Sequence, residues 1–158
     1  MRKSIAIIII CLVFVIFQES FMLEFFGGAI NPNLIIALAF SFMFIDDYRT
    51  AMFTALVGGI FLDFLGVGII GLSSFLLILF LLFSRWIKKT IFRGIWIQIV
   101  MIIVSTIVFK LVINYPDMIY SGKILFSGLI NSIISSLIFL VLNKIRQRYL
   151  SIEYRIKA

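Results

Sequence analysis

Long apolar segments separated by short polar ones follow one another through most of the chain. Of its 158 residues, 63% are hydrophobic and only 13% are charged, whereas about half of the residues in a soluble domain are apolar. Several segments approach the roughly 20 apolar residues that a helix needs to cross a bilayer. The sequence therefore predicts a single all-α integral membrane domain, spanning 1–158, with little mass outside the lipid.

The apolar segments predict a bundle of about six transmembrane helices. The first begins like a signal peptide, but residues 18–22 offer no small-residue cleavage site, so an uncleaved helix is expected. Pro32 suits the first turn of the second helix, which is short for a span. The segment Phe75 to Phe83 is apolar all round and is expected to contact lipid or a partner's membrane helix. The expected helices are about 4–23, 32–45, 50–65, 72–83, 95–113 and 124–142, followed by a basic tail at 143–158.

The basic residues fall on one side of this expected bundle. Six spans place both termini on the same side, and all but two of the 14 Lys and Arg residues lie there. The exceptions are Lys110, within helix five, and Lys123, in a loop on the other side. Because positive residues mark the cytoplasmic side of membrane proteins, both termini are predicted to be cytoplasmic. Membrane topology and attraction to anionic lipid at the inner face therefore explain the net charge of +7 without a nucleic-acid partner. The alternative is that the basic clusters form a specific binding patch.

The stretch from Ala51 to Leu72 combines small residues, one acid and a turn. Residues four apart share a face of a helix, and small side chains there let another backbone approach closely. Asp63 follows near the end of the same segment, and the glycines after it predict a tight turn into a returning helix. We expect a structural hub in which Asp63 fixes the outer mouth of the bundle. The residues expected to pack helices or to dock a partner are Ala51, Ala55, Gly58, Gly59, Asp63 and Gly71 there, with Asn131 and Ser135 in helix six.

Asp63 and Lys110 are the two charges placed deepest in the expected hydrocarbon region, near the outer ends of their helices. An unpaired charge in lipid costs roughly 2.5 to 3.5 kcal/mol on insertion scales. One interpretation is that Asp63 faces the bundle and Lys110 either forms an intramembrane ion pair with it or snorkels outward. The other is that both side chains simply reach the interface.

Helix six carries Ser127, Asn131 and Ser135 at four-residue intervals. Such a row is expected to turn inward and to share hydrogen bonds with a neighbouring helix. The substrate path of a transporter would show the same pattern, so both interpretations stay open.

No residue pattern in the sequence indicates catalysis. The chain has no histidine, and its single cysteine, Cys11, is expected to serve as a small apolar side chain in the first helix. Asp46 and Asp47 fit a turn and cap better than a metal site, and no phosphate-cradling glycine loop occurs. We therefore expect a protein that is not an enzyme and that uses no cofactor or metal.

The arrangement resembles MreD, a family of small membrane proteins of the bacterial rod-shape system. The segment Asn31-Pro32-Asn33-Leu34 resembles the family's Pro-Asp-Leu helix start, with Asn33 in place of the Asp. The segment Gly59-Ile60-Phe61-Leu62-Asp63 resembles its Gly-x-x-x-Asp, and Gly71-Leu72 resembles the Gly-Leu that opens its next helix. The resemblance covers essentially the whole chain.

The resemblance implies a scaffold of the cell elongation complex, or elongasome, in the bacterial cell membrane. Such a scaffold couples the cytoplasmic filament to peptidoglycan synthesis and so to cell shape. The partners it implies are MreC and, directly or indirectly, MreB, RodA and a class B penicillin-binding protein. The fold is also similar to the substrate-binding component of energy-coupling-factor vitamin transporters, so the alternative function is small-molecule uptake.

Overall fold

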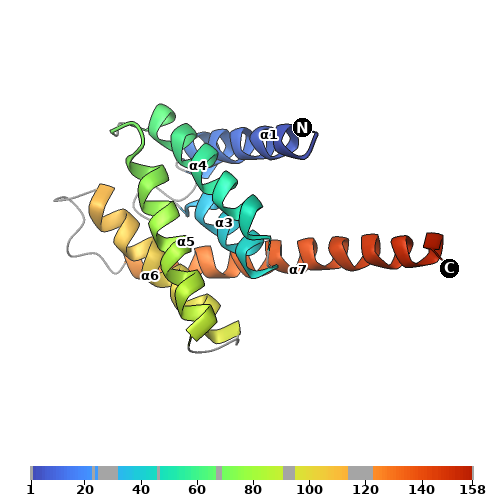
Figure 1. Cartoon of the computed structure of the whole chain (residues 1–158). Coiled ribbons are helices and arrows are strands. Elements are labelled where there is room, and N and C mark those ends of the chain that lie inside the picture. The colour runs from blue at the N-terminus through green and yellow to red at the C-terminus, as the bar shows by residue number, and fades with distance from the viewer. Residues whose placement is uncertain are drawn as a thin grey trace.

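The computed structural model describes residues 2–22, 24, 32–45, 47–66, 69–90, 95–113 and 123–157, and within these ranges the chain is all-helical without strands (Figure 1). The all-α class predicted from the sequence is thereby confirmed. The described α-helices are α1 (Arg2–Phe17), α3 (Leu34–Phe44), α4 (Tyr48–Leu65), α5 (Leu72–Thr90), α6 (Ile95–Ile113) and α7 (Lys123–Lys157), and a π-helical turn, η1 (Gln18–Met22), continues α1.

Three of the described helices are long and apolar enough to cross a membrane. These segments are Ser4–Phe21, Tyr48–Leu65 and Leu125–Ile145, while the apolar stretches Leu34–Phe44 and Ile99–Ile113 are shorter. Their length and composition indicate a membrane protein, as the sequence predicts.

The shortest of these helices, α3, lies at the centre of the bundle. Every residue from Leu34 to Ser41 is buried, and so is Met43. α3 packs mainly against α4 and α7, and it also contacts α1, α5 and α6. Because protein rather than lipid surrounds it, α3 does not need the full apolar length of a lipid-facing span.

α4 and α5 form an antiparallel hairpin, with α1 on the other side of α4. Figure 1 shows α4 and α5 side by side, joined by the short connection after Leu65, and α6 beside α7. α4 thus contacts α1, α3 and α5, which makes it the helix that holds this half of the bundle together.

Two helices continue well past their expected ends. α5 was expected over 72–83 but runs to Thr90, so Arg85 and Lys88 lie on a helix and not in a loop. α7 was expected over 124–142 but runs to Lys157, so the tail at 143–158 is helical almost to its end (Figure 1). Hydropathy marks where a segment leaves the lipid, whereas Lys, Arg and Gln favour helix and let it continue into water.

The segment 75–83, expected to contact lipid or a partner's membrane helix, is exposed on one face of α5 and packed inside the bundle on the other. Leu77 and Leu81 are fully buried against the bundle, and Ser84 lies beside them. Phe75 and Leu79, on the opposite face, are exposed. The three- and four-residue spacing of each set is that of a helix with one packed face and one open face.

Candidate functional site

Gly59 lies directly against the backbone of α5. A Cβ placed on Gly59 would lie 2.5 Å from the Cα of Ser74, closer than any ordinary contact. Ala51 and Ala55, which precede Gly59 at four-residue intervals, are fully buried. The row formed by Ala51, Ala55 and Gly59 therefore includes a point where the backbones of α4 and α5 lie very close together.

Thr54 and Gly58, four residues apart on α4, face other neighbours. A Cβ placed on Gly58 would lie 2.5 Å from Cγ2 of Ile35 on α3. Thr54, four residues earlier, is fully buried, and its carbonyl oxygen lies 4.0 Å from Sγ of Cys11 on α1. Adjacent positions on α4 thus serve contacts with α3 and α1 as well as with α5.

Asp63 closes the turn between α4 and α5. Its carboxylate accepts hydrogen bonds from the backbone N–H groups of Gly71, at 2.6 Å, and of Ser73, at 3.2 Å. Gly71 has φ +95°, a backbone conformation that favours glycine. A carboxylate at the start of α5 satisfies N–H groups that lack an intrahelical partner and complements the helix dipole. Asp63 therefore acts as a cap for the helix that follows it.

Ser74 makes a further bond between the two helices of the hairpin. Its hydroxyl donates a 2.8 Å hydrogen bond to the carbonyl oxygen of Leu56, on α4. The hairpin is therefore held by a close backbone approach at Gly59, a side-chain bond at Ser74 and the capping bonds of Asp63.

Asp63 and Lys110 are both buried, at 6% and 8% exposed. Asp63 faces the bundle, as one of the two interpretations of the sequence predicts. Its described hydrogen bonds go to the backbone of its own turn. The ion pair between Asp63 and Lys110 stays a prediction.

Four large apolar side chains project around this turn, and we call them the turn patch. They are exposed to between 52% and 74%, although they adjoin the fixed carboxylate of Asp63. This group was not predicted from the sequence, although large apolar residues on both sides of a turn rich in glycine could have indicated it. The turn patch consists of Phe64, Leu65, Ile69 and Ile70.

The polar row of α7 turns inward and binds α3 and α6. Ser135 donates a 3.1 Å hydrogen bond to the carbonyl oxygen of Ala37, and its hydroxyl lies 3.1 Å from that of Ser41. Asn131 donates a 2.9 Å hydrogen bond from Nδ2 to Oγ1 of Thr106. All of these side chains are buried, as is Ser127. Ser41 and Thr106 were missed because a single hydroxyl in an apolar helix does not reveal which neighbour it contacts.

The buried start of α3 is capped by two amides. The backbone N–H of Leu34 donates to Oε1 of Gln18 at 2.8 Å, and those of Ile35 and Ile36 donate to Oδ1 of Asn33 at 3.1 Å. Gln18 begins the π-helical turn η1. Asn33 thus performs the capping role of an acid without its charge.

A scan against protein-family models, a search of curated proteins and a search of solved structures find no match for this chain. Within the described ranges, no group of three or more His, Cys, Asp or Glu residues is placed to hold a metal ion. The contacts described above are those of helix packing and helix capping, beside an exposed apolar patch.

Proposed function

We propose that this chain is a non-enzymatic membrane scaffold of the bacterial cell elongation complex, as its resemblance to the MreD family implies. It crosses the bacterial cell membrane about six times with both termini in the cytoplasm. It docks MreC on the outer side and so couples the MreB filament to peptidoglycan synthesis by RodA and a class B penicillin-binding protein. Anionic lipid contacts its inner face.

The arrangement of the helices supports this orientation. The cationic end of α5 meets the start of α4, where the guanidinium of Arg85 lies over the ring of Tyr48. The opposite end of the same hairpin carries the turn patch and no Lys or Arg between Thr50 and Ser84. A hairpin with its basic residues at one end is the pattern that the positive-inside rule associates with the cytoplasmic side.

The observation that carries the docking proposal is the turn patch on a turn held by Asp63. Exposed apolar side chains on a mobile loop would lose conformational freedom on binding, whereas those on a fixed turn lose less. The capping bonds from Gly71 and Ser73 provide that fixation. A membrane-anchored partner such as MreC, whose bulk lies outside the membrane, is suited to cover such a patch.

The inward polar row supports packing over transport. The hydroxyl of Ser135 and the amide nitrogen of Asn131 join α7 to α3 and α6, and both side chains are fully buried. Oδ1 of Asn131 accepts no hydrogen bond within the described residues. Side chains that bond to a neighbouring helix hold the two helices together in the membrane. A vitamin-binding component would instead turn them toward its ligand.

The first experiment is gentle purification of the chain from its native membrane and identification of the proteins that accompany it. We expect MreC to co-purify, and depletion of the chain to abolish rod shape. Recovery of an energising ATPase module with a bound vitamin, and no MreC, would exclude the scaffold function in favour of the uptake alternative.

Variants locate the docking surface. Replacing Ile70 by Asn should abolish recovery of MreC while the chain stays folded, because it removes apolar area from the turn patch. Gly59→Leu and Asp63→Leu should also disrupt assembly, since they displace the turn itself. Leu79→Phe, on the open face of α5, is the matched control and should be tolerated. Intact MreC binding and cell shape in Gly59→Leu would contradict the hub.

A further inference from the structure

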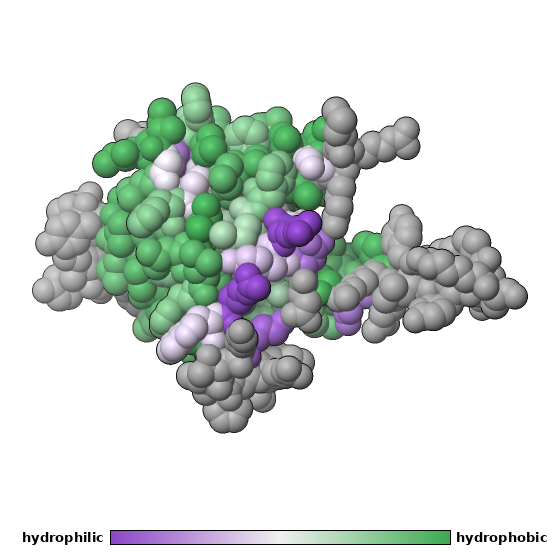
Figure 2. Space-filling view, viewed as in Figure 1, coloured by the Kyte–Doolittle hydropathy of each residue, from purple (hydrophilic) through white to green (hydrophobic). Residues whose placement is uncertain are grey.

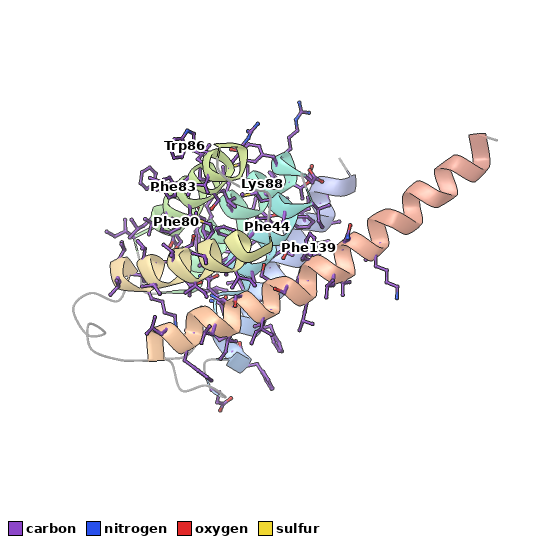
Figure 3. All side chains as sticks on the ribbon, turned by 90° about the horizontal axis from the view of Figure 1, so that it is seen from below. Phe44, Phe80, Phe83, Trp86, Lys88 and Phe139 are labelled. Atoms are coloured by element: carbon purple, nitrogen blue, oxygen red, sulfur yellow. The ribbon has the colours of Figure 1, made fainter. Side chains whose placement is uncertain are left out.

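Two cations of α5 lie against aromatic rings of the neighbouring helices. Cζ of Arg85 is 3.9 Å from the ring centroid of Tyr48 on α4, and Nζ of Lys88 is 5.7 Å from that of Phe44 on α3. In Figure 3, Lys88 and Phe44 lie next to each other at the same end of the bundle. A ring within about 6 Å attracts and orients a cation through its quadrupole.

Figure 2 shows a hydrophilic patch over the start of α4 and the adjacent part of α5, on a face that is largely apolar. Arg49, near the start of α4, and Arg85, on α5, are both exposed. Arg85, held over the ring of Tyr48, therefore presents a positive charge at a defined position.

An apolar track leads along α5 to this charge. Its side chains are exposed, and the last two, Phe83 and Trp86, stack with ring centroids 6.3 Å apart. Figure 3 shows Trp86 and Phe83 following one another along the helix. Tryptophan is enriched at the depth of lipid headgroups, and the apolar residues before it lie at the depth of acyl chains. The track consists of Phe75, Leu79, Leu82, Phe83 and Trp86.

We propose that this end of α5 is a binding site for an anionic phospholipid. The headgroup phosphate binds Arg85, held in place by Tyr48, and one acyl chain lies along the apolar track. The proposal rests on the membrane insertion proposed above. A water-soluble acidic segment would match the charge but would leave the track uncovered, so the combination favours a lipid.

Tryptophan quenching tests the site directly, because the chain has two tryptophans and one of them borders it. In a Trp96→Phe background, Trp86 is the sole tryptophan of the chain. The full chain is reconstituted in bilayers containing brominated phosphatidylglycerol or brominated phosphatidylcholine at equal bromine content. We expect Trp86 to be quenched more strongly by the anionic lipid, and equal quenching by the two lipids would overturn the proposal.

Three variants separate a built site from general attraction to a charged leaflet. Arg85→Gln should lower the preference for the anionic lipid about fivefold, as expected for one basic side chain at an anionic surface. Tyr48→Leu should lower it too, although the charge is unchanged. Lys144→Gln removes an exposed charge on α7 and should change the preference by less than about twofold, since distant charges are screened. Equal losses in Arg85→Gln and Lys144→Gln, or no loss in Tyr48→Leu, would overturn the proposal.

A soluble headgroup identifies the source of the phosphate. Glycerol phosphate, which lacks acyl chains, should not relieve quenching by the anionic lipid at millimolar concentration. If it competes, the site binds phosphate and not lipid, and the proposal fails. The two quenching measurements use the isolated chain. If the chain shows no preference for the anionic lipid but MreC is still recovered, only this site is rejected. If the chain shows the preference but MreC is not recovered, only the scaffold function is rejected.

Discussion

The carboxylate of Asp63 accepts a 2.6 Å hydrogen bond from the backbone N–H of Gly71, so a side chain of α4 closes the turn that leads into α5. Both carboxylate oxygens also lie 3.2 Å from the backbone nitrogen of Ser73. The acid that stands in an otherwise apolar segment of the sequence is thus engaged by the backbone of its own turn. Its consequences are structural and can be measured as stability.

Asp63→Leu should destabilise the protein by about 1 to 3 kcal/mol, because it leaves buried N–H groups of Gly71 and Ser73 without an acceptor. Asp63→Asn keeps one carbonyl oxygen in the same place and should cost less. The measurement is the free energy of unfolding of the reconstituted chain for each variant. Equal stability of Asp63→Leu and the unaltered chain would show that the capping bonds contribute nothing.

Gly59→Ala should destabilise the hairpin by about 1 to 3 kcal/mol, the typical cost of forcing an extra carbon into a packed site. The atoms it would meet are backbone atoms of Ser74, which cannot move without shifting α5. Gly128→Ala on α7 is the matched control, since its Cβ would lie 3.3 Å from Cγ2 of Ile103, a side-chain atom that can adjust. The two variants are compared by thermal unfolding, and a similar effect in both would contradict the close approach at Gly59.

Ser135→Ala should weaken the contact between α7 and α3 by about 0.6 kcal/mol, the average for an interhelical hydrogen bond in a membrane protein. Ser136→Ala is the control, because the hydroxyl of Ser136 donates to the carbonyl oxygen of Ser132 within α7. The free energy of unfolding should fall for Ser135→Ala and stay unchanged for Ser136→Ala. A larger loss of unfolding free energy in Ser136→Ala than in Ser135→Ala would mean that the inward row does not join the helices.

The sequence predicts these hub residues because their chemistry is local. Small residues four apart mark a close approach, and a single acid in an apolar segment before a glycine turn stands out, so Gly59 and Asp63 could be singled out without a structure. The capping role of Asp63 was not predicted. The neighbours they contact could not be identified in this way. Ser74 and Ile35 are ordinary residues of other helices, and only the packing of α4 between α3 and α5 brings them close.

The ends of the helices and the central position of α3 could not be predicted from the sequence, for a different reason. Apolar length estimates the part of a helix inside lipid, so it gave no sign that α5 and α7 continue through charged residues. α3 was expected to be a short span, but its length alone did not show that protein surrounds it. The amide of Gln18 was likewise overlooked, although a lone polar side chain near the end of an apolar helix needs a buried partner.

Gln18→Leu should destabilise the junction of η1 and α3 by about 1 to 3 kcal/mol, because the backbone N–H of Leu34 would then be buried without an acceptor. Gln18→Glu retains an oxygen but puts a second carboxyl group against Glu19, whose carboxylate accepts a 3.1 Å hydrogen bond from the amide of Gln18, so it should not restore the stability. Hydrogen exchange at Leu34 measures the effect at the site. Unchanged protection of this amide in Gln18→Leu would mean that the bond does not hold α3 in place.

Asp63 and Lys110 should be coupled if they form the predicted ion pair. A carboxylate has about four acceptor positions, and the hydrogen bonds from Gly71 and Ser73 leave room for a further donor. The cycle consists of Asp63→Asn, Lys110→Gln and the double variant, each compared by unfolding free energy. Paired groups should show an interaction energy of about 0.5 to 3 kcal/mol, whereas independent groups lose stability additively. Additive losses would leave Asp63 as a cap alone and would assign the burial of Lys110 to other contacts of α6.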